Sequence, residues 1–540
     1  MVNRFDDQIV SVAAGDRERT APILGGAMDY FRGPRFRTPD SYTGQYVLAR
    51  NRNLIPPQWN LFELGGWSLG TSWLPVVEVR SDSGLALGWC IGYPLVDNLD
   101  VGNPIYLTGA DAFDVGTGAV EAFYRRTWGR YVLVLLSRAR RALYLDPHGS
   151  LAAVYSTSQQ IVASTPTLMP AGHDWNENLI EALDFPNSDL WFPSGLTAKK
   201  GVRRLLPNHC LDLEAWNVRR HWPEGRSSLE VEPDVMTSVR AMTSAMRTTI
   251  GNVAASHPIQ CTLTAGRDSR TLLACARPVL QRATFFTHAV DTPNPDTLIA
   301  SRLAAKFGLR HFETPYESAS VEEMKEWLFL TGHSVSGTIW RIHRGMQSLD
   351  RASVLMHGTG GELGRGCYWR PTDHPGTALS ASELARRAEL PDQGEIPSEI
   401  EKWLSGLAGY SALTILDLFY IEQTLGCWAA PQFFSNECSL FAFSPFNHRT
   451  VVTSMMRLPH KYKKRQQLVK DICLEEWPEL LELPFNDFTG DIKLKRLASR
   501  IVEFGFGALR TSVLSMAKVI AQRGVRGRRL RRSTDSKATT

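Results

Sequence analysis

Residues 264–269 read Thr-Ala-Gly-Arg-Asp-Ser and combine a small-residue turn with an acid and a hydroxyl group. The small side chains of Ala265 and Gly266 leave backbone N–H groups accessible at the start of a predicted helix, where an anion is favoured. Asp268 is well placed to hold the magnesium ion that accompanies a polyphosphate. We therefore predict that this turn binds the pyrophosphate part of ATP. The predicted phosphate-binding residues are Leu263, Thr264, Ala265, Gly266, Arg267, Asp268, Ser269 and Arg270.

Apolar strands and amphipathic helices alternate around this turn. The predicted strands are 259–263, 283–288, 310–314 and 353–357. A helix is predicted directly after the turn, and Asn294 with Pro295 predicts the start of another. This order is typical of a parallel sheet, in which ligands bind at the carboxyl ends of the strands.

A second glycine-rich turn, His357-Gly-Thr-Gly-Gly-Glu-Leu-Gly-Arg-Gly-Cys-Tyr368, follows the last of these strands. Together the two turns resemble the synthetase domain of the asparagine synthetase family, whose motifs are Ser-Gly-Gly-x-Asp-Ser and Gly-x-Gly-x-Asp-Glu-x-x-Gly-Gly-Tyr. Asp296 and the segment Phe443-Ser-Pro-Phe-Asn-His-Arg449 also agree with that family, and the resemblance covers most of residues 235–490. The further site residues that the resemblance implies are His288, Gly358 and Gly360 for ATP, and Asp268 and Glu362 for Mg²⁺.

The first half of the chain resembles the glutaminase-type domain that precedes the synthetase in the same family. Residues 129–155 and Gly201-Val-Arg-Arg-Leu-Leu-Pro-Asn-His209 carry this likeness. A glutaminase of this type needs cysteine after the initiator methionine, because its free α-amine activates the thiolate. Val2 stands there, so we expect no glutamine hydrolysis by this route. The resemblance implies α/β and α+β architecture: Ntn-hydrolase-like β-sandwich layers in a degenerate glutaminase-like domain (1–225), and a parallel-sheet PP-loop ATPase domain, adenine nucleotide alpha hydrolase-like (235–500).

The family's chemistry begins when a carboxylate attacks the α-phosphate of ATP, which gives an acyl-adenylate and pyrophosphate. An amine then attacks the adenylate. The sequence departs from asparagine formation at this second step, because Thr359 stands where the family has Glu and Leu363 replaces the second acid of its Asp-Glu pair. An incoming alkylamine must still lose a proton. The candidates for the second step are Thr359, Glu422 and Glu437, with Lys464 or Lys493 stabilising the oxyanion and Lys461, Lys463 and Lys495 as open alternatives.

Three functions fit these residues. The Gly-Thr-Gly-Gly-Glu turn with its following Arg, and the glutaminase-like remnant, favour similarity to lasso peptide macrolactam synthetases (cyclases), which join a peptide's N-terminal amine to an Asp or Glu side chain. That function implies a precursor (core) peptide as substrate and a leader peptidase as partner. The alternative is an amide synthetase that uses ammonia or an amine on a small amino acid, like asparagine synthetase or β-lactam synthetase. A non-catalytic nucleotide-binding scaffold is the third.

The composition is that of an ordinary globular enzyme, with 540 residues, 43% hydrophobic and 21% charged. Eight cysteines without a Cys-x-x-Cys pair, no signal peptide and no long apolar run favour a cytoplasmic protein without a zinc site or membrane span. The net charge of +5 is unevenly placed. Residues 501–540 are predicted to form an amphipathic helix and a basic, disordered tail that does not bind nucleic acid. Residues 371–399, rich in Pro, Gly and acids, are predicted to be a loose insertion beside the site.

Overall fold

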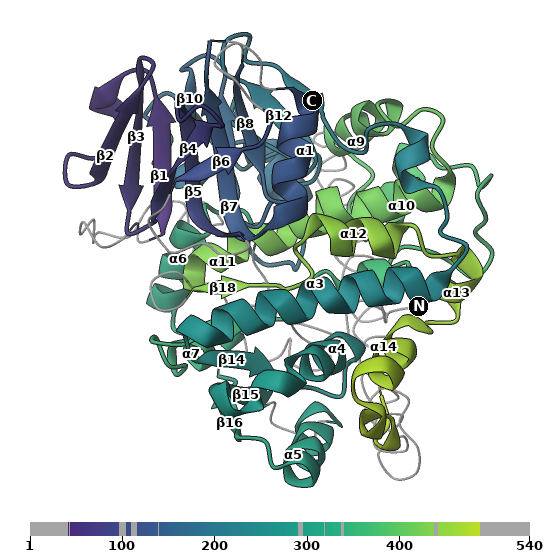
Figure 1. The fold of residues 1–540 in the computed structure, drawn as a ribbon. Coiled ribbons are helices and arrows are strands. Elements are labelled where there is room, and N and C mark those ends of the chain that lie inside the picture. The colour runs from purple at the N-terminus through teal and green to yellow at the C-terminus, as the bar shows by residue number, and fades with distance from the viewer. Residues whose placement is uncertain are drawn as a thin grey trace, which may run out of the picture. The chain divides into compact units, whose positions relative to one another are not determined.

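The computed structural model describes residues 42, 44–96, 104–109, 116–138, 140–289, 295–317, 319–335, 340–436 and 441–485. The described residues up to Pro484 belong to one compact unit (Figure 1). Several predicted features lie outside the described residues: the Asn294 cap, Glu437, Lys493, Lys495 and the segment 501–540. None of the described helices has the length and apolar composition that a membrane crossing requires.

The part of the chain between residues 45 and 220 contributes two largely antiparallel sheets to the described structure. The first has the strand order β11-β9-β10-β1-β3-β2, and the second has the order β13-β12-β8-β7-β5-β4-β6. The strands of the first are β1 (Gln45–Ala49), β2 (Asn60–Leu64), β3 (Trp67–Ser72), β9 (Val154–Ser156), β10 (Ile161–Ala163) and β11 (Arg203–Arg204). The strands of the second are β4 (Val76–Ser81), β5 (Ala86–Val96), β6 (Ile105–Leu107), β7 (Thr127–Leu136), β8 (Arg141–Leu145), β12 (His209–Asp212) and β13 (Val218–Arg220). Neighbouring strands are antiparallel except β4 and β6, which are parallel.

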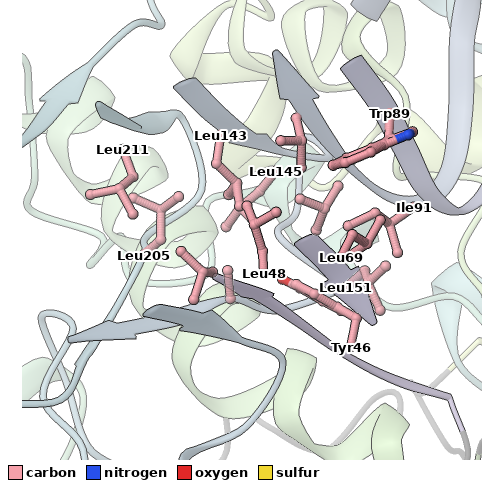
Figure 2. Packing of buried hydrophobic residues seen from close by; sticks show 14 of the residues in the cluster. Tyr46, Leu48, Leu69, Trp89, Ile91, Leu143, Leu145, Leu151, Leu205 and Leu211 are labelled. Carbon is pink, nitrogen blue, oxygen red and sulfur yellow. The ribbon is translucent and has the colours of Figure 1, made fainter. Parts of the chain in front are cut away.

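The two sheets pack face to face through a shared apolar core. Tyr46 and Leu48 of β1 and Leu69 of β3 enter it from the first sheet, and Trp89 and Ile91 of β5 enter it from the second (Figure 2). Because alternate side chains of a strand point to opposite faces, each strand contributes every second residue to this core. The observed layers agree with the predicted sandwich arrangement, and their assignment to the Ntn-hydrolase class stays a prediction.

The other face of the second sheet is covered by α1 (Thr117–Arg126). Phe123 and Tyr124 of this helix pack on Tyr131 and Leu133 of β7 in a separate apolar cluster. As a result β7 is buried at every position. Burial on both faces explains why 131–136 reads as a continuous apolar run rather than as an alternating one.

A wholly parallel sheet follows later in the described chain, with the order β16-β15-β14-β17-β18. Its strands are β14 (Ile259–Thr262), β15 (Ala283–Ala289), β16 (His311–Pro315), β17 (Val354–Met356) and β18 (Ala442–Phe443). In the centre, Cys261 of β14 pairs with Phe285 of β15 on one side and with Met356 of β17 on the other. After β14 the chain adds β15 and β16 on one side of that strand. It then returns to add β17 and β18 on the other side. The strand order therefore reverses between β14 and β17, and in such sheets ligands bind at this point of the carboxyl edge.

Helices pack around the parallel sheet: α3 contacts α4 and α12, and α5 contacts β15 and β16 (Figure 1). The α-helices are α2 (Glu177–Ala182), α3 (Val235–Ser256), α4 (Arg267–Ala276), α5 (Pro295–Phe307), α6 (Val321–Leu330), α7 (Trp340–Gln347), α8 (Ala381–Arg387), α9 (Ile396–Ser405), α10 (Ala412–Phe419), α11 (Ala430–Asn436), α12 (Arg449–Met456), α13 (His460–Lys464) and α14 (Leu468–Glu476). A π-helix, η10 (Tyr420–Ala429), joins α10 to α11, and the 3-10 helices are η4 (Arg52–Leu54), η5 (Pro166–Leu168), η6 (Arg226–Leu229), η7 (Arg277–Arg282), η9 (Gly361–Arg365) and η11 (Pro478–Glu482).

The predicted strands of the second half are confirmed as β14 to β17, with boundaries that differ by one or two residues. The helix predicted to start at Pro295 is confirmed as α5. The prediction of a loose insertion at 371–399 is wrong, because this stretch contains α8 and a buried ion-pair cluster around Arg387. The chain is thus a mixed α/β protein with a parallel sheet, antiparallel sheets and a helical part, and the PP-loop class of the parallel part stays a prediction.

Candidate functional site

The first glycine-containing turn joins β14 to α4, and its own hydroxyl groups hold it in shape. Ser269 Oγ lies 2.9 Å from Thr264 Oγ1 and accepts the Thr264 N–H at 3.2 Å. The Gly266 N–H donates to Thr264 Oγ1 at 2.9 Å, and helix α4 begins at Arg267. Leu263 is buried and its N–H donates to a carbonyl of β15 at 2.8 Å. These bonds fix the backbone of the turn at the carboxyl end of the central strand.

A carboxylate from a neighbouring helix reaches this turn. The Ala265 N–H donates to Oδ1 of Asp296, in the first turn of α5, at 2.8 Å. A carboxylate oxygen at a backbone N–H is the protein's own equivalent of a phosphate oxygen. The turn therefore holds an anionic group at an N–H that was predicted to favour one.

The second turn leaves β17 and contains two glycines in the left-handed region. Gly360 has φ of 104° and Gly366 has φ of 66°, and these angles strain any residue with a Cβ atom. The Gly361 N–H donates to the Gly358 carbonyl at 3.2 Å. Gly361 also lies against the first turn, because a Cβ atom placed on it would be only 2.3 Å from Asp268 Oδ1. The two predicted turns, far apart in the sequence, are thus in direct contact.

Arg365 joins the two acids that were predicted to hold Mg²⁺. Its Nη1 lies 2.5 Å from Asp268 Oδ1, and its Nη2 lies 3.2 Å from Glu362 Oε1. The Asp268 side chain is 1% exposed and the Arg365 side chain 11%. Burial raises the pKa of Tyr420 well above its ordinary value, and the nearby charges of Glu362 and Asp268 raise it further. The structure therefore brings both predicted metal ligands together, with a guanidinium between them.

Two further residues predicted to contact ATP have protein partners. Arg270 is buried and donates to the carbonyls of Leu480 at 2.8 Å and Pro484 at 3.1 Å, so it ties α4 to the end of η11. Burial lowers the pKa of Arg270 to about 10. His288 lies near the end of β15, where its Nδ1 is 2.7 Å from Thr314 Oγ1 and burial lowers its pKa to about 4. His288 is thus a neutral imidazole on the strand next to β14, whereas Arg270 acts as a structural clamp.

Thr359 and Lys464, two candidates for the second step, lie in different surroundings. Thr359 is buried, its carbonyl accepts from Ser444 Oγ at 2.7 Å, and its Oγ1 has no hydrogen-bond partner among the described residues. Lys464 Nζ donates to the carbonyls of Pro371 at 2.9 Å and Asp373 at 2.6 Å. Thr359 therefore has an unused polar atom inside the second turn, whereas Lys464 stabilises the start of the 371–399 segment.

Glu422 lies within the π-helix η10 and is fully buried. Its carboxylate accepts hydrogen bonds from Arg220 and from Trp403 Nε1, the latter at 2.6 Å. Burial alone would raise the pKa of Glu422, but Arg220, His209 and Trp403 outweigh it, and the pKa is below its ordinary value. A general base needs access to the substrate and a pKa near the working pH. This arrangement disfavours the prediction that Glu422 is the base.

The antiparallel sheets reach the second turn through His148. A Cβ atom placed on Gly360 would be 2.4 Å from Cε1 of the His148 ring. The His148 N–H donates to Asn447 Oδ1 at 2.9 Å, and Asn447 Nδ2 donates to Asp146 Oδ1 at 2.8 Å. Sequence reasoning missed this contact, because Asp146 and Asn447 lie in two separately recognised segments and nothing in one sequence pairs them.

A pair of neutral imidazoles therefore lies behind the second turn. Burial lowers the pKa of His148 to about 3, helped by the nearby His357 and Arg449. Burial also lowers the pKa of His357 to about 3, with a contribution from Arg130. The His357 ring stacks on Phe433 with ring centroids 4.7 Å apart. The two imidazoles are therefore polar but uncharged at neutral pH.

The described residues contain no group of three or more His, Cys, Asp and Glu side chains that could hold a metal ion. The pair Asp268 and Glu362 nevertheless fits Mg²⁺, which is usually bound by one or two carboxylates together with substrate phosphates and water. The donor set is oxygen-only, as this ion prefers.

Comparisons with known proteins add little to this geometry. No family model and no curated protein matches the sequence. A solved structure of NMN synthetase from Francisella tularensis is similar at 10% identity, over 35% of this chain and 93% of that chain, with a TM-score of 0.18. A TM-score this low does not establish a common fold.

Proposed function

We propose that this chain is an ATP-dependent, AMP-forming carbon–nitrogen ligase that activates a carboxylate as an acyl-adenylate and then forms an amide. The observation that carries the proposal is the contact between the two glycine-rich turns, Asp268 against Gly361, where the strand order reverses between β14 and β17. Polyphosphate ligands bind at this point of parallel sheets, on backbone N–H groups at a helix start. The site thus offers a place for a nucleotide and an acidic pair for its metal.

The chain's own groups have distinct tasks in this proposal. The N–H groups of 267–269, at the start of α4, bind phosphate oxygens, and Asp268 and Glu362 hold Mg²⁺. When bound, Mg²⁺ would neutralise phosphate charge during attack at the α-phosphorus. Adenylation otherwise needs positioning and charge stabilisation rather than covalent help from the protein.

Thr359 is the residue of the second step that the surroundings favour most. A buried hydroxyl group without a partner in the described chain is unusual in a native protein. We propose that its Oγ1 forms a hydrogen bond to the reacting acyl group or the incoming amine, because no described residue occupies this hydroxyl group. Lys493 stays a prediction for the oxyanion role.

Within this class, we propose macrolactam closure of a lasso-type core peptide as the finer function. The resemblance of the second turn, with Arg365 following it, supports this finer function. A leader peptidase of the same pathway and a cytoplasmic setting belong to this proposal, as does a division into domains 1–225 and 235–500. Amide formation on a small amino acid is the alternative within the same adenylating chemistry.

Exchange of labelled pyrophosphate into ATP tests the proposal. The purified full chain is incubated with Mg²⁺, ATP and a candidate acid, which is either a peptide with Asp or Glu side chains or a small amino acid. Product masses are measured by mass spectrometry. We expect acid-dependent exchange, and a peptide product lighter by one water. Asp268→Ala should lower exchange at least about 100-fold, whereas Glu313→Gln, an exposed acid on β16 of the same sheet, serves as the matched control and should not. Equal exchange in Asp268→Ala and wild type would refute the assignment of the site, and turnover of small acids alone would refute the finer function.

A further inference from the structure

Arg365 occupies the position between Asp268 and Glu362 that a metal ion would share. Its Nη1 contacts Asp268 at 2.5 Å and its Nη2 contacts Glu362 at 3.2 Å. The three side chains are at most 13% exposed, so their charges interact through protein more than through water. Two buried carboxylates side by side are unstable without a cation, and in this structure the guanidinium supplies one.

A second arginine in the chain has the same kind of partners but a different geometry. Arg387 binds Asp373 through two nitrogens, at 2.5 and 3.0 Å, and its Nε donates to Glu383 Oε1 at 2.8 Å. Its Nη1 also donates to the carbonyl of Tyr368 at 2.8 Å. Bidentate pairing combined with a backbone contact is the geometry of a permanent structural ion pair. Arg365 instead divides its two terminal nitrogens between two acids, on a turn rich in glycine, and this arrangement is easier to exchange.

We propose that Arg365 is an exchangeable counter-ion: it holds Asp268 and Glu362 together until Mg²⁺ and ATP bind, and then moves from the carboxylates to the phosphates. This inference rests on the proposed function. Arginine suits both positions, because its planar donor fork matches carboxylate and phosphate oxygens alike. The exchange keeps the buried acids neutralised in both states and prevents Mg²⁺ from binding firmly without nucleotide. Arg365 is thus a positioning residue that couples metal binding to nucleotide binding.

Arg365→Gln and Arg387→Gln test this inference as a matched pair. The melting temperature of each full-length variant is measured in EDTA and in excess Mg²⁺, without nucleotide. Both variants should melt at least about 2 °C below wild type in EDTA. Mg²⁺ should restore Arg365→Gln but not Arg387→Gln, and should leave wild type unchanged. Equal Mg²⁺ responses of the two variants would overturn the inference.

Binding measurements by calorimetry provide the second readout. Arg365→Gln should bind Mg²⁺ alone at least about tenfold more tightly than wild type, because the competing cation is gone, and Mg²⁺-ATP about tenfold more weakly, because a phosphate contact is gone. A merely structural role would shift both affinities in the same direction, and that result would overturn the inference. The double variant Glu362→Gln/Arg365→Gln should lose the gain in Mg²⁺ affinity.

Two controls separate the possible failures. If Arg365→Gln does not fold, Arg365→Lys replaces it. A single ammonium group bridges two acids less well than a guanidinium, so this variant should again bind Mg²⁺ alone more tightly than wild type. An unchanged Mg²⁺ affinity would overturn the inference. If wild type binds no Mg²⁺-ATP at all, the proposed function fails. If wild type binds Mg²⁺-ATP and the Arg365 variants show no opposite shifts, only the counter-ion inference fails.

Discussion

Asp146 and Asp268 are both buried aspartates that follow a β-strand closely, yet their negative charges are stabilised in different ways. Asp146 comes directly after β8 and accepts hydrogen bonds from neutral donors, among them the N–H groups of Ser150 at 2.9 Å and Leu151 at 3.0 Å and the Asn447 amide. Asp268 comes soon after β14 and binds the guanidinium of Arg365. Asp146 is enclosed by fixed dipoles, with the Arg130 guanidinium nearby, whereas Asp268 is bonded directly to a charged side chain.

The difference shows which of two buried acids is available for binding. Backbone N–H groups cannot leave without unfolding their turn, so Asp146 is held permanently and serves structure. A long charged side chain can move aside, so Asp268 can exchange its partner for another cation. Burial raises the pKa of Asp146, and its hydrogen bonds offset only part of that shift. The Asp146 carboxylate therefore depends on all of these donors to stay ionised inside the protein.

The largest effect should come from Asp146→Asn. The amide NH₂ group would face donors that now bind the carboxylate, and the free energy of unfolding should fall by about 2–4 kcal/mol. Chemical denaturation followed by circular dichroism measures the loss. Asp392→Asn, at an exposed position, is the control and should stay within about 0.5 kcal/mol of wild type. A loss as small as that of the control would break the contrast between the two aspartates.

The second-largest effect should come from acid, which should lower the free energy of unfolding through the buried histidines behind the second turn. His148 and His357 have pKa values of about 3 in the folded chain, below their ordinary value of 6.5, so the unfolded chain binds protons first as the pH falls. Their stabilisation is complete above pH 6.5 and declines toward pH 3, by about 2 kcal/mol per histidine between pH 6.5 and 5.

Denaturation of wild type and His357→Gln at pH 7 and pH 5 measures this decline. The variant lacks one of the titrating groups, so its stability should depend less on pH than that of wild type. Identical pH dependence in the two proteins would mean that the buried imidazoles are not responsible.

Asp268→Asn should have the smallest effect on stability, about 1 kcal/mol, because only one hydrogen bond to a charged group is weakened and Arg365 keeps Glu362 as a charged partner. Its effect on ligand binding should be large. Mg²⁺-ATP should raise the melting temperature of wild type, as any ligand of the native state does, and should not raise that of the variant. Destabilisation equal to that of Asp146→Asn would show that Asp268 is structural too.

Local sequence patterns were sufficient to predict the strands β14 to β17, the helix that starts at Pro295 and the two turns that meet at Asp268 and Gly361. These features depend on periodicity, on caps and on glycine positions, all of which lie within a short stretch of chain. The partners of individual charged residues could not be predicted in this way. Arg270 binds carbonyls near Pro484, and Glu422 binds Arg220, because tertiary contacts bring distant segments together.

The same limitation explains the misjudged segment 371–399. Its Pro, Gly and acidic residues are typical of a loop. In the structure, however, Arg387 forms an ion pair with Asp373, and Lys464 donates a hydrogen bond to the Asp373 carbonyl. Composition alone does not show such compensation. Arg365 was visible in the second motif as a following arginine, yet only the structure shows that it binds both acids.

The contact between His148 and Gly360 has a consequence for how the chain tolerates change. The second turn packs against a ring from the antiparallel layers, so separating the two halves would remove that support. A fragment that starts at residue 235 would lose the surface on which Gly360 rests. The first half thus has a structural task in a turn that lies in the second.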